Sequence, residues 1–401
     1  MRLAQRPDLG HLTYCTNIHP GESWPEVAAS LERHLPEVKR RVAADQLFGV
    51  GLRLSAVAAA ALREPAALEQ LKVLLQDNGC YVFTINGFPY GPFHGRPVKE
   101  QVYQPDWRHE ERVTYSAQLA DLLVALLPEE PGLDGSVSTV PGTFKPLAEA
   151  PGAIEAMARN LVRHAAHLVG IRERTGRTIA LALEPEPCCF LETIAETVAF
   201  FEQQLFDAGA VRQLSELTGL APGDAEAALR RHLGVCYDVC HAAVEFEDPA
   251  ASLRALRSAG IGVPKLQLSA ALRIAVVGAE TAAQLRPFDE PVYLHQVIER
   301  RDGRLTRHLD LPQALAALGE AAGAEWRVHF HVPVFLAELR DFSTTQAFLG
   351  EILALHRRAP ISAHLEVETY TWDVLPARYR QVDVASAIAR ELTWVIEQLD
   401  A

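Results

Sequence analysis

Acidic, imidazole and amide side chains stand at the ends of successive short apolar runs in this sequence. The runs TIALAL, LGVCY, PKL, WRV and AHL are followed by residues able to ligate a metal or move a proton, namely Glu184, Glu186, Asp238, His241, Gln267, His329, His331, Glu366 and Glu368. Carboxylates and imidazoles bind Mn²⁺, Mg²⁺, Co²⁺ or Zn²⁺, and a carboxylate can also abstract a proton. A single polar residue at a strand end is usually a helix cap or a solvated loop residue, so the prediction depends on the recurrence over four late runs.

One divalent metal ion is predicted at these strand ends. Its predicted ligands are Glu184, Asp238, Gln267, His331 and Glu368, with Gln267 supplying a neutral oxygen. Residues two apart in a strand share a face. His329 should therefore point the same way as His331, and Glu366 the same way as Glu368. We expect only the last member of each pair to reach the rim of the site.

The apolar runs alternate with longer amphipathic stretches, which is typical of βαβ units around a parallel sheet. The nine predicted strands are 12–17, 48–54, 80–85, 135–140, 178–184, 233–238, 264–269, 326–332 and 363–369. Eight such units make a (β/α)8 TIM barrel, whose active site lies at the carboxyl ends of its strands. We predict a single barrel domain over residues 1–401. A doubly wound open sheet is the alternative, but the GxGxxG turn that usually accompanies it is missing.

Nine strands are one more than the barrel needs. The region 285–312 is predicted to be an insertion with its own hairpin around Asp302-Gly303, because Asp-Gly favours a tight two-residue turn. One of the later predicted strands would then belong to the insertion and not to the barrel wall. The capping-box pair Ser23 and Glu26 predicts the start of one helix. Gly176, after a long amphipathic stretch, predicts the end of another.

The composition is that of a globular protein, with 49% hydrophobic and 22% charged residues. A formal net charge of −13 opposes binding to nucleic-acid phosphates, so no nucleic-acid partner is expected. No apolar run is long enough to span a membrane, and the N-terminus has no signal core. The six cysteines are sparse and lack zinc-site spacing. We therefore expect a cytoplasmic protein, and a homodimer remains open.

The order LALEPEP, CYDVCH, KLQLS, HFHVPVF and LEVET resembles the xylose-isomerase-like TIM barrels. That superfamily includes sugar and sugar-phosphate isomerases, ketose epimerases, inosose dehydratases and endonuclease IV. Longer motifs are similar to the EboE proteins, called metabolite traffic proteins: HLTYCTNIHPGESWPEV, NGFPYGPFHGRPVKEQVYQPDW, EPEPCCFLET, CYDVCHAAVEFED and HLEVETYTW. This second resemblance covers almost the whole chain.

The resemblance implies Glu184, Asp238 and Glu368 as metal ligands. Gln267 stands where the superfamily usually has His, and its neutral oxygen favours Mg²⁺ or Mn²⁺ over Zn²⁺. His241 matches the histidine of the Asp-x-x-His pattern, a metal or substrate contact in relatives. His329 departs from endonuclease IV, which has Asp at that position.

The leading hypothesis is a metal-dependent isomerase or epimerase, or a related lyase, acting on a sugar, sugar-phosphate or cyclitol-like small molecule through an enediolate. Glu184 and Glu368 are the predicted catalytic pair, one removing a proton and the other returning it. The residues expected to hold the substrate are His19, Arg53, Asn86, Lys145, Glu186, His241, His329, Tyr90 and Trp372. A non-catalytic metabolite-binding or traffic protein is the alternative. An endonuclease IV-like phosphodiesterase is disfavoured by Gln267, His329 and the net charge.

Overall fold

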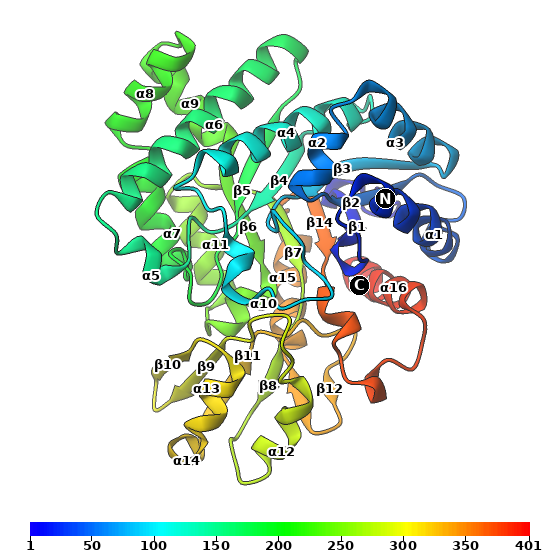
Figure 1. Cartoon of the computed structure of the whole chain (residues 1–401), viewed down its shortest axis with the longest axis vertical. Helices are drawn as coiled ribbons and strands as arrows, with labels where there is room; N and C mark the ends of the chain where they lie inside the picture. The colour runs from blue at the N-terminus through cyan, green and yellow to red at the C-terminus, as the bar shows by residue number, and fades with distance from the viewer.

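A computed structural model describes residues 1–401, and its centre is a barrel of eight parallel strands (Figure 1). The barrel strands are β1 His11–Tyr14, β2 Phe48–Arg53, β3 Cys80–Asn86, β4 Gly135–Thr139, β5 Ile179–Leu183, β6 Leu233–Asp238, β7 Gly262–Leu268 and β14 His364–Val367. Neighbouring strands pair in the order β1-β14-β7-β6-β5-β4-β3-β2. Except for the first residues of β7, these strands are buried on both faces, as their nearly continuous apolar sequences require. The predicted TIM barrel is therefore confirmed.

The barrel closes between β1 and β2 with few backbone hydrogen bonds. Cys15 forms a parallel bridge to Gly51, and the Thr13 hydroxyl takes the place of a further ladder bond. Its Oγ1 donates to the carbonyl of Gly49 over 2.7 Å and accepts from the Gly51 amide over 2.9 Å. Because only these few contacts join β1 to β2, the barrel is nearly closed and not fully closed.

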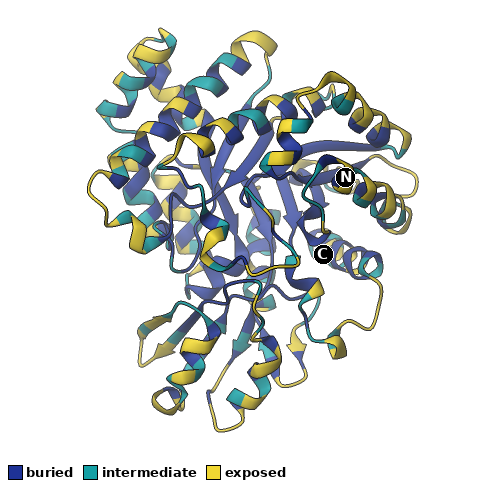
Figure 2. Cartoon of the chain, viewed as in Figure 1, coloured by how far each residue is buried: buried dark blue, intermediate teal, exposed yellow.

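Helices surround the barrel, with their outer faces exposed and their inner faces buried (Figure 2). Their bounds are α1 Trp24–Val42, α2 Ala56–Ala61, α3 Pro65–Asp77, α4 Glu110–Leu126, α5 Lys145–Ala148, α6 Ala153–Thr175, α7 Ile194–Phe200, α8 Ala208–Thr218, α9 Pro222–His232, α10 Val239–Val244, α11 Pro249–Ser258, α15 Gln346–Arg358 and α16 Val384–Asp400. The predicted capping box opens α1, where the Ser23 amide donates to Glu26 over 2.8 Å. Gly176 ends α6 with φ of 72°, a left-handed conformation that glycine adopts without strain. None of the helices is both long and apolar enough to cross a membrane.

Single helical turns complete the connections. They are η1 Pro7–Leu9, η2 Thr16–Ile18, η3 Lys99–Tyr103, η4 Phe201–Leu205, η5 Arg286–Phe288, η6 Tyr370–Asp373 and η7 Ala377–Tyr379.

A second sheet is inserted between β7 and β14, below the barrel in Figure 1. Its strands are β8 Leu272–Ile274, β9 Val297–Arg301, β10 Arg304–His308, β11 Glu325–Val328, β12 Glu338–Leu339 and β13 Phe342–Thr344, with the short helices α12 Thr281–Leu285, α13 Leu311–Ala316 and α14 Leu318–Ala321. The strand order is β10-β9-β11-β8-β13-β12, and all the pairings are antiparallel. The predicted hairpin is confirmed, because Asp302 and Gly303 join β9 to β10 with φ of 48° and 77°. The insertion is longer than the predicted 285–312.

The predicted strand 326–332, the one in excess of the eight that the barrel needs, belongs to this insertion. Its first half is β11, and residues 329–332 run without regular structure back toward the barrel mouth. The apolar and β-branched sequence was sufficient to predict a strand here, but it could not show which sheet the strand joins.

Candidate metal and acid–base site

Three carboxylates converge at the carboxyl ends of the barrel strands. Glu184 follows β5, Asp238 ends β6 and Glu368 follows β14. One oxygen from each lies within 4.8 Å of the other two, and all three side chains are buried. The strands place them there because the ends of parallel barrel strands share one rim.

Two of the three carboxylates are held by hydrogen bonds to one of their oxygens. Two amides, from Asn17 and Asn86, donate to Glu368 Oε1 over 2.6 and 3.1 Å. The Ser269 hydroxyl and the His241 backbone amide donate to Asp238 Oδ1 over 2.8 and 3.0 Å. The other oxygen of Asp238, Oδ2, is buried and has no hydrogen-bond partner, and neither has Glu184 Oε2.

Burial and neighbouring negative charge raise the pKa of the two glutamates. Burial, reinforced by the charges of Glu368 and Asp238, raises the pKa of Glu184 well above its ordinary value. Burial and the neighbouring Asp238 also raise the pKa of Glu368, to about 8. Buried carboxylates with unpaired oxygens are costly unless a cation compensates them. The donor set therefore fits a hard divalent cation.

Gln267 lies beside this group on β7, where it pairs in register with both Asp238 and Glu366. It is fully buried, and its Nε2 has no partner. Its Oε1 lies 4.0 Å from the Cys236 thiol. The contacts of its side chain neither require nor oppose the predicted role as a ligand.

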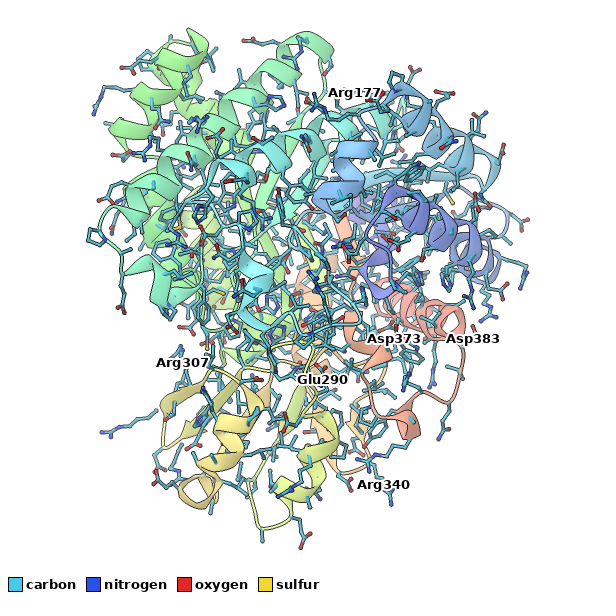
Figure 3. The ribbon with its side chains drawn as sticks, in the orientation of Figure 1. Arg177, Glu290, Arg307, Arg340, Asp373 and Asp383 are labelled. Carbon is cyan, nitrogen blue, oxygen red and sulfur yellow. The ribbon has the colours of Figure 1, made fainter.

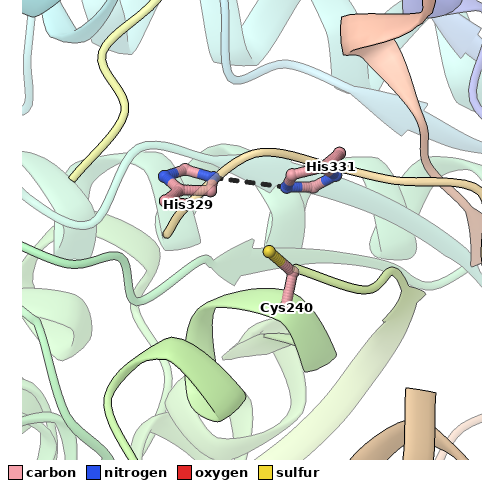
Figure 4. A group of neighbouring side chains, drawn as sticks. All are labelled: Cys240, His329 and His331. Carbon is pink, nitrogen blue, oxygen red and sulfur yellow. Dashed lines mark hydrogen bonds between the residues drawn. The ribbon is translucent and has the colours of Figure 1, made fainter. Parts of the chain in front are cut away.

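Three histidines form a second group next to the carboxylates. His329 Nε2 lies 3.1 Å from His241 Nε2 and 3.2 Å from His331 Nε2. Figure 4 shows His329 and His331 facing each other above the Cys240 thiol, and one atom of each of these three residues lies within 4.8 Å of the others. Burial lowers the pKa of His331 to about 4 and holds that of His329 well below its ordinary value, so both rings are neutral near pH 7.

Four of the five predicted ligands, all except Gln267, fall into two groups that share Asp238, and His241, predicted as a substrate contact, joins one of them. Atoms of Asp238, His241 and His331 lie within 4.8 Å of one another, as do atoms of Glu184, Asp238 and Glu368.

A cavity of about 510 Å³, open to solvent, reaches this site, and we call it the mouth cavity. It is lined by Asn17, Asn86, Phe88, Pro89, Phe93, Val98, Lys99, Val102, Tyr103, Glu184, Glu186, His241, Tyr293, Leu294, His329, Glu368 and Tyr370. Acids, amides and imidazoles contribute one part of the lining, and aromatic and aliphatic side chains contribute the other. Phe93 packs against Tyr293 and Tyr370 with ring centroids 5.1 and 5.3 Å apart.

The two residues of each predicted pair behave differently. Glu368 lines the mouth cavity, whereas Glu366 lies deeper in the barrel, in agreement with the expected order. The expectation for the histidines is wrong, because His329 lines the cavity and His331 does not. The argument from strand alternation fails here because residues 329–332 are not a strand.

The predicted substrate residues fall into two sets. Asn86, Glu186, His241 and His329 line the mouth cavity. The other five do not line it: His19 contacts the Tyr14 hydroxyl, Arg53 pairs with Glu22, Lys145 pairs with Glu192 and Glu196, Tyr90 packs on Tyr115, and Trp372 is buried in η6.

Two residues absent from the sequence prediction contribute to the site. Lys265, fully buried in the barrel, lies 2.6 Å from Glu366. Burial disfavours its charge, but the Glu366 carboxylate raises the pKa of Lys265 overall. Its position two residues before Gln267 on one strand was a usable signal. Gln296 bonds both His329 and Glu186, and no pattern in the inserted region indicated that role.

No protein-family model matches the sequence, and no curated protein sequence does. Several solved structures resemble the chain in fold, and some of them are xylose isomerase-like or xylose isomerase domain proteins. One is a xylose isomerase-like TIM barrel protein from Mycobacterium smegmatis in complex with magnesium, at 12% identity, TM-score 0.49, and coverage of 97% of this chain and 96% of that chain. Others are AsbF, a probable 3-DHS dehydratase from Bacillus anthracis (12% identity, TM-score 0.46, 96% and 97% covered), and the IolI protein with a zinc atom (14% identity, TM-score 0.44, 97% and 98% covered). The assignment of the barrel rests on the strand order and pairing of the chain itself.

Proposed function

We propose that this chain is a metal-dependent isomerase or epimerase, or a lyase that begins with the same proton abstraction. The observation that supports it most is the convergence of Glu184, Asp238 and Glu368 beside the mouth cavity, with unpaired oxygens on the first two. These three residues would hold the cation, with the amide oxygen of Gln267 as a further candidate ligand. A bound divalent cation would act as a Lewis acid on a substrate carbonyl and its neighbouring hydroxyl.

The two glutamates have complementary roles in this proposal. Glu184 lines the mouth cavity, and its own Oε2 has no hydrogen-bond partner. This suits a base that removes the proton from the carbon next to a carbonyl. Glu368 is held by Asn17 and Asn86, so its position is fixed. It also lines the mouth cavity, and after taking up a proton it would return it to the neighbouring carbon.

The lining of the mouth cavity suggests the substrate class. Asn86, Glu186 and His241 offer hydrogen-bond partners for hydroxyl groups. Phe93 and Tyr293 offer flat apolar surfaces to the carbon face of a ring. We propose a sugar, sugar phosphate or cyclitol-like metabolite, which agrees with the resemblance of the sequence motifs to EboE-type metabolite traffic proteins.

Proton exchange with solvent tests this proposal without knowledge of the product. A panel of ketoses, their phosphates and cyclitol ketones would be incubated in D₂O with Mg²⁺ or Mn²⁺ and the purified chain, and deuterium uptake would be followed by NMR. We expect exchange at the carbon next to the carbonyl, and a loss of about 10²–10⁴-fold in Glu184→Gln.

Glu216→Gln is the matched control, because Glu216 is exposed on α8 and makes no side-chain contact in the site. A panel member that binds tightly without exchange would favour a carrier. Unchanged exchange in Glu184→Gln would show that Glu184 is not the base.

A further inference from the structure

Lys99 is the only lysine or arginine that lines the mouth cavity. Its Nζ donates to Asp310 Oδ2 over 2.6 Å, so its charge is already paired. Three carboxylates, those of Glu184, Glu186 and Glu368, line the same cavity. A negatively charged group of a substrate would therefore meet acids there and no unpaired ammonium or guanidinium group, and burying such a charge without a partner is costly.

Other basic side chains on the connections that follow the barrel strands are also engaged. Arg53 donates to both oxygens of Glu22, each over 3.1 Å. Lys145 lies 2.5 Å from Glu192. Arg112 is fully buried and donates to three backbone carbonyls. Each of these cations would have to give up its partner to reach a ligand in the cavity.

The connections after the last two barrel strands, here β7 and β14, are where barrel enzymes often hold a substrate phosphate. In this chain the connection after β7 contains the inserted sheet, and it contributes Tyr293, Leu294 and His329 to the lining. The connection after β14 contributes Tyr370 of η6, a single turn that also contains Asp373. Apolar and aromatic side chains thus predominate at the usual place of a phosphate site.

These side chains are part of a larger apolar surface, which we call the apolar wall. It consists of Phe93, Val98, Tyr293, Leu294 and Tyr370, all of which line the mouth cavity. Its three aromatic rings contact one another, with centroids 5.0–5.3 Å apart.

Hydrogen bonds hold the two main parts of the apolar wall together. The Val292 carbonyl, in the inserted region, accepts from the backbone amides of Val98 and Lys99 over 2.7 and 3.1 Å. The wall is therefore formed before a ligand arrives, and a preformed surface binds without the cost of ordering its loops.

We propose that the substrate carries an apolar group, and no phosphate, at the end remote from its reacting carbonyl. The inference rests on the proposed function, which places the carbonyl at the three carboxylates. Phe93 and Tyr293 cover the face of a ring, and Val98 and Leu294 extend that surface with aliphatic side chains suited to a hydrocarbon substituent. Among the proposed classes this selects an uncharged, polyhydroxylated carbonyl compound with a hydrocarbon substituent, and it excludes the sugar phosphates.

Three ketoses that differ only at carbon 6 test this substrate class. D-Fructose, 6-O-butyl-D-fructose and D-fructose 6-phosphate carry a hydroxyl, a butyl ether and a phosphate there. Calorimetry with Mg²⁺ present would measure the dissociation constant of each. Since each buried CH₂ group strengthens binding about fourfold, we expect the butyl ether to bind at least about tenfold more tightly than either of the others.

A variant of the apolar wall assigns that preference to a place. Leu294→Ser should remove most of the advantage of the butyl ether and leave the binding of fructose unchanged. Val276→Ser is the matched control, because Val276 lies in the same insertion and is 69% exposed. Its binding of all three ketoses should equal that of the unaltered chain.

A second variant should create affinity for phosphate. Asp310→Asn keeps the oxygen that accepts from the backbone amides of His295 and Leu311 but loses the charge that holds Lys99. We expect fructose 6-phosphate to bind about two- to fivefold more tightly, with no change for the butyl ether. Asp289→Asn, an exposed neighbour in sequence, should change neither.

Two results in the unaltered chain would overturn the proposal: fructose 6-phosphate binding as tightly as the butyl ether, or the butyl ether binding no more tightly than fructose. Unchanged phosphate binding in Asp310→Asn would contradict the role given to the paired Lys99. Deuterium exchange reports the reaction separately. A butyl ether that binds tightly but exchanges no deuterium would disprove the proposed reaction and confirm the apolar site.

Discussion

At the scale of single residues, the site is a group of acids whose charges oppose one another. Glu368 shows this most clearly, since two amides fix one of its oxygens while burial and Asp238 disfavour its ionisation. A carboxyl whose pKa is raised in the folded chain binds its proton more tightly there than in the unfolded chain. Its contribution to stability is therefore complete below about pH 4.5 and is lost as the pH rises to about 8.

We predict that metal-free protein loses unfolding free energy between about pH 5 and pH 8, on the order of 2 kcal/mol. Glu184 adds to the loss, because burial raises its pKa as well. Urea unfolding at a series of pH values measures the slope. Added Mg²⁺ or Mn²⁺ should reduce the slope, since a bound cation stabilises the ionised carboxylates.

Glu368→Gln should flatten the same curve in metal-free protein, because the amide does not titrate. Glu216→Gln, an exposed residue, should leave the curve unchanged. An equally steep curve in Glu368→Gln would assign the pH dependence to other groups.

The acids of the site were predictable and the imidazoles only in part. Glu184, Asp238 and Glu368 follow short apolar runs, so the predicted strand ends were enough to place these three residues at one rim of the barrel. His331 was predicted with the carboxylates, but its ligand atoms group with those of Asp238 and His241. The position of His329 depends on Gln296, a residue of another strand connection, and no spacing rule connects those two residues.

At the scale of secondary-structure elements, the inserted sheet holds part of the site in place. Gln296, directly before β9, orients His329, and His295 Nδ1 donates to the His329 carbonyl over 3.0 Å. The hairpin of β9 and β10 is fastened to the barrel by Arg307, which lies where the two parts meet (Figure 3). Arg307 approaches Glu192 and Glu245 to 2.8 and 2.6 Å.

We predict that Arg307→Met destabilises the attachment of the hairpin by about 1–3 kcal/mol. Glu245 is fully buried and would lose its cation, while Lys145 continues to pair with Glu192. The value lies below the usual cost of breaking a buried pair because the Arg307 side chain is 34% exposed. Hydrogen exchange of the β9 and β10 amides measures the change.

Arg304→Met is the matched control, because Arg304 is exposed on the same strand. Its amide exchange should equal that of the unaltered chain. Slow exchange retained in Arg307→Met would mean that apolar packing alone holds the hairpin.

The elements themselves were largely predictable. Eight of the nine predicted strands form the barrel, and the Asp302-Gly303 turn was located from two residues. The extent of the insertion was not predictable, because β8, β12 and β13 have only two or three residues each. Segments this short have no periodicity to detect and are formed by their pairing partners.

At the scale of the whole molecule, the barrel interior holds buried side chains of opposite charge. Beneath the site, Lys265 faces Glu366, and both side chains are fully buried. The Lys265 Nζ also donates to Ser138 on the far side of the barrel over 3.3 Å. Gly51 makes room for this pair, because a Cβ there would lie 1.8 Å from Glu366 Oε2. Lys265 also moderates the crowding above it, since its charge lowers the pKa of Glu184 and of Glu368 against the larger effect of burial.

Lys265 therefore stabilises the fold and the site together, and removing it should affect both. We predict that Lys265→Met costs about 3–5 kcal/mol of unfolding free energy, because Glu366 is left as an uncompensated buried charge. Lys265→Met combined with Glu366→Met should recover most of that loss, since an apolar pair of similar volume often replaces a buried ion pair at little cost. Arg163→Met, which breaks the surface pair with Glu110, should cost less than about 1 kcal/mol. Urea unfolding of all four proteins at one pH measures these differences. If the double variant were as unstable as Lys265→Met, Lys265 would act mainly on Glu184 and Glu368 and not on Glu366. The loss of unfolding free energy in the metal-free protein would then be largest at high pH, where Glu184 and Glu368 are ionised.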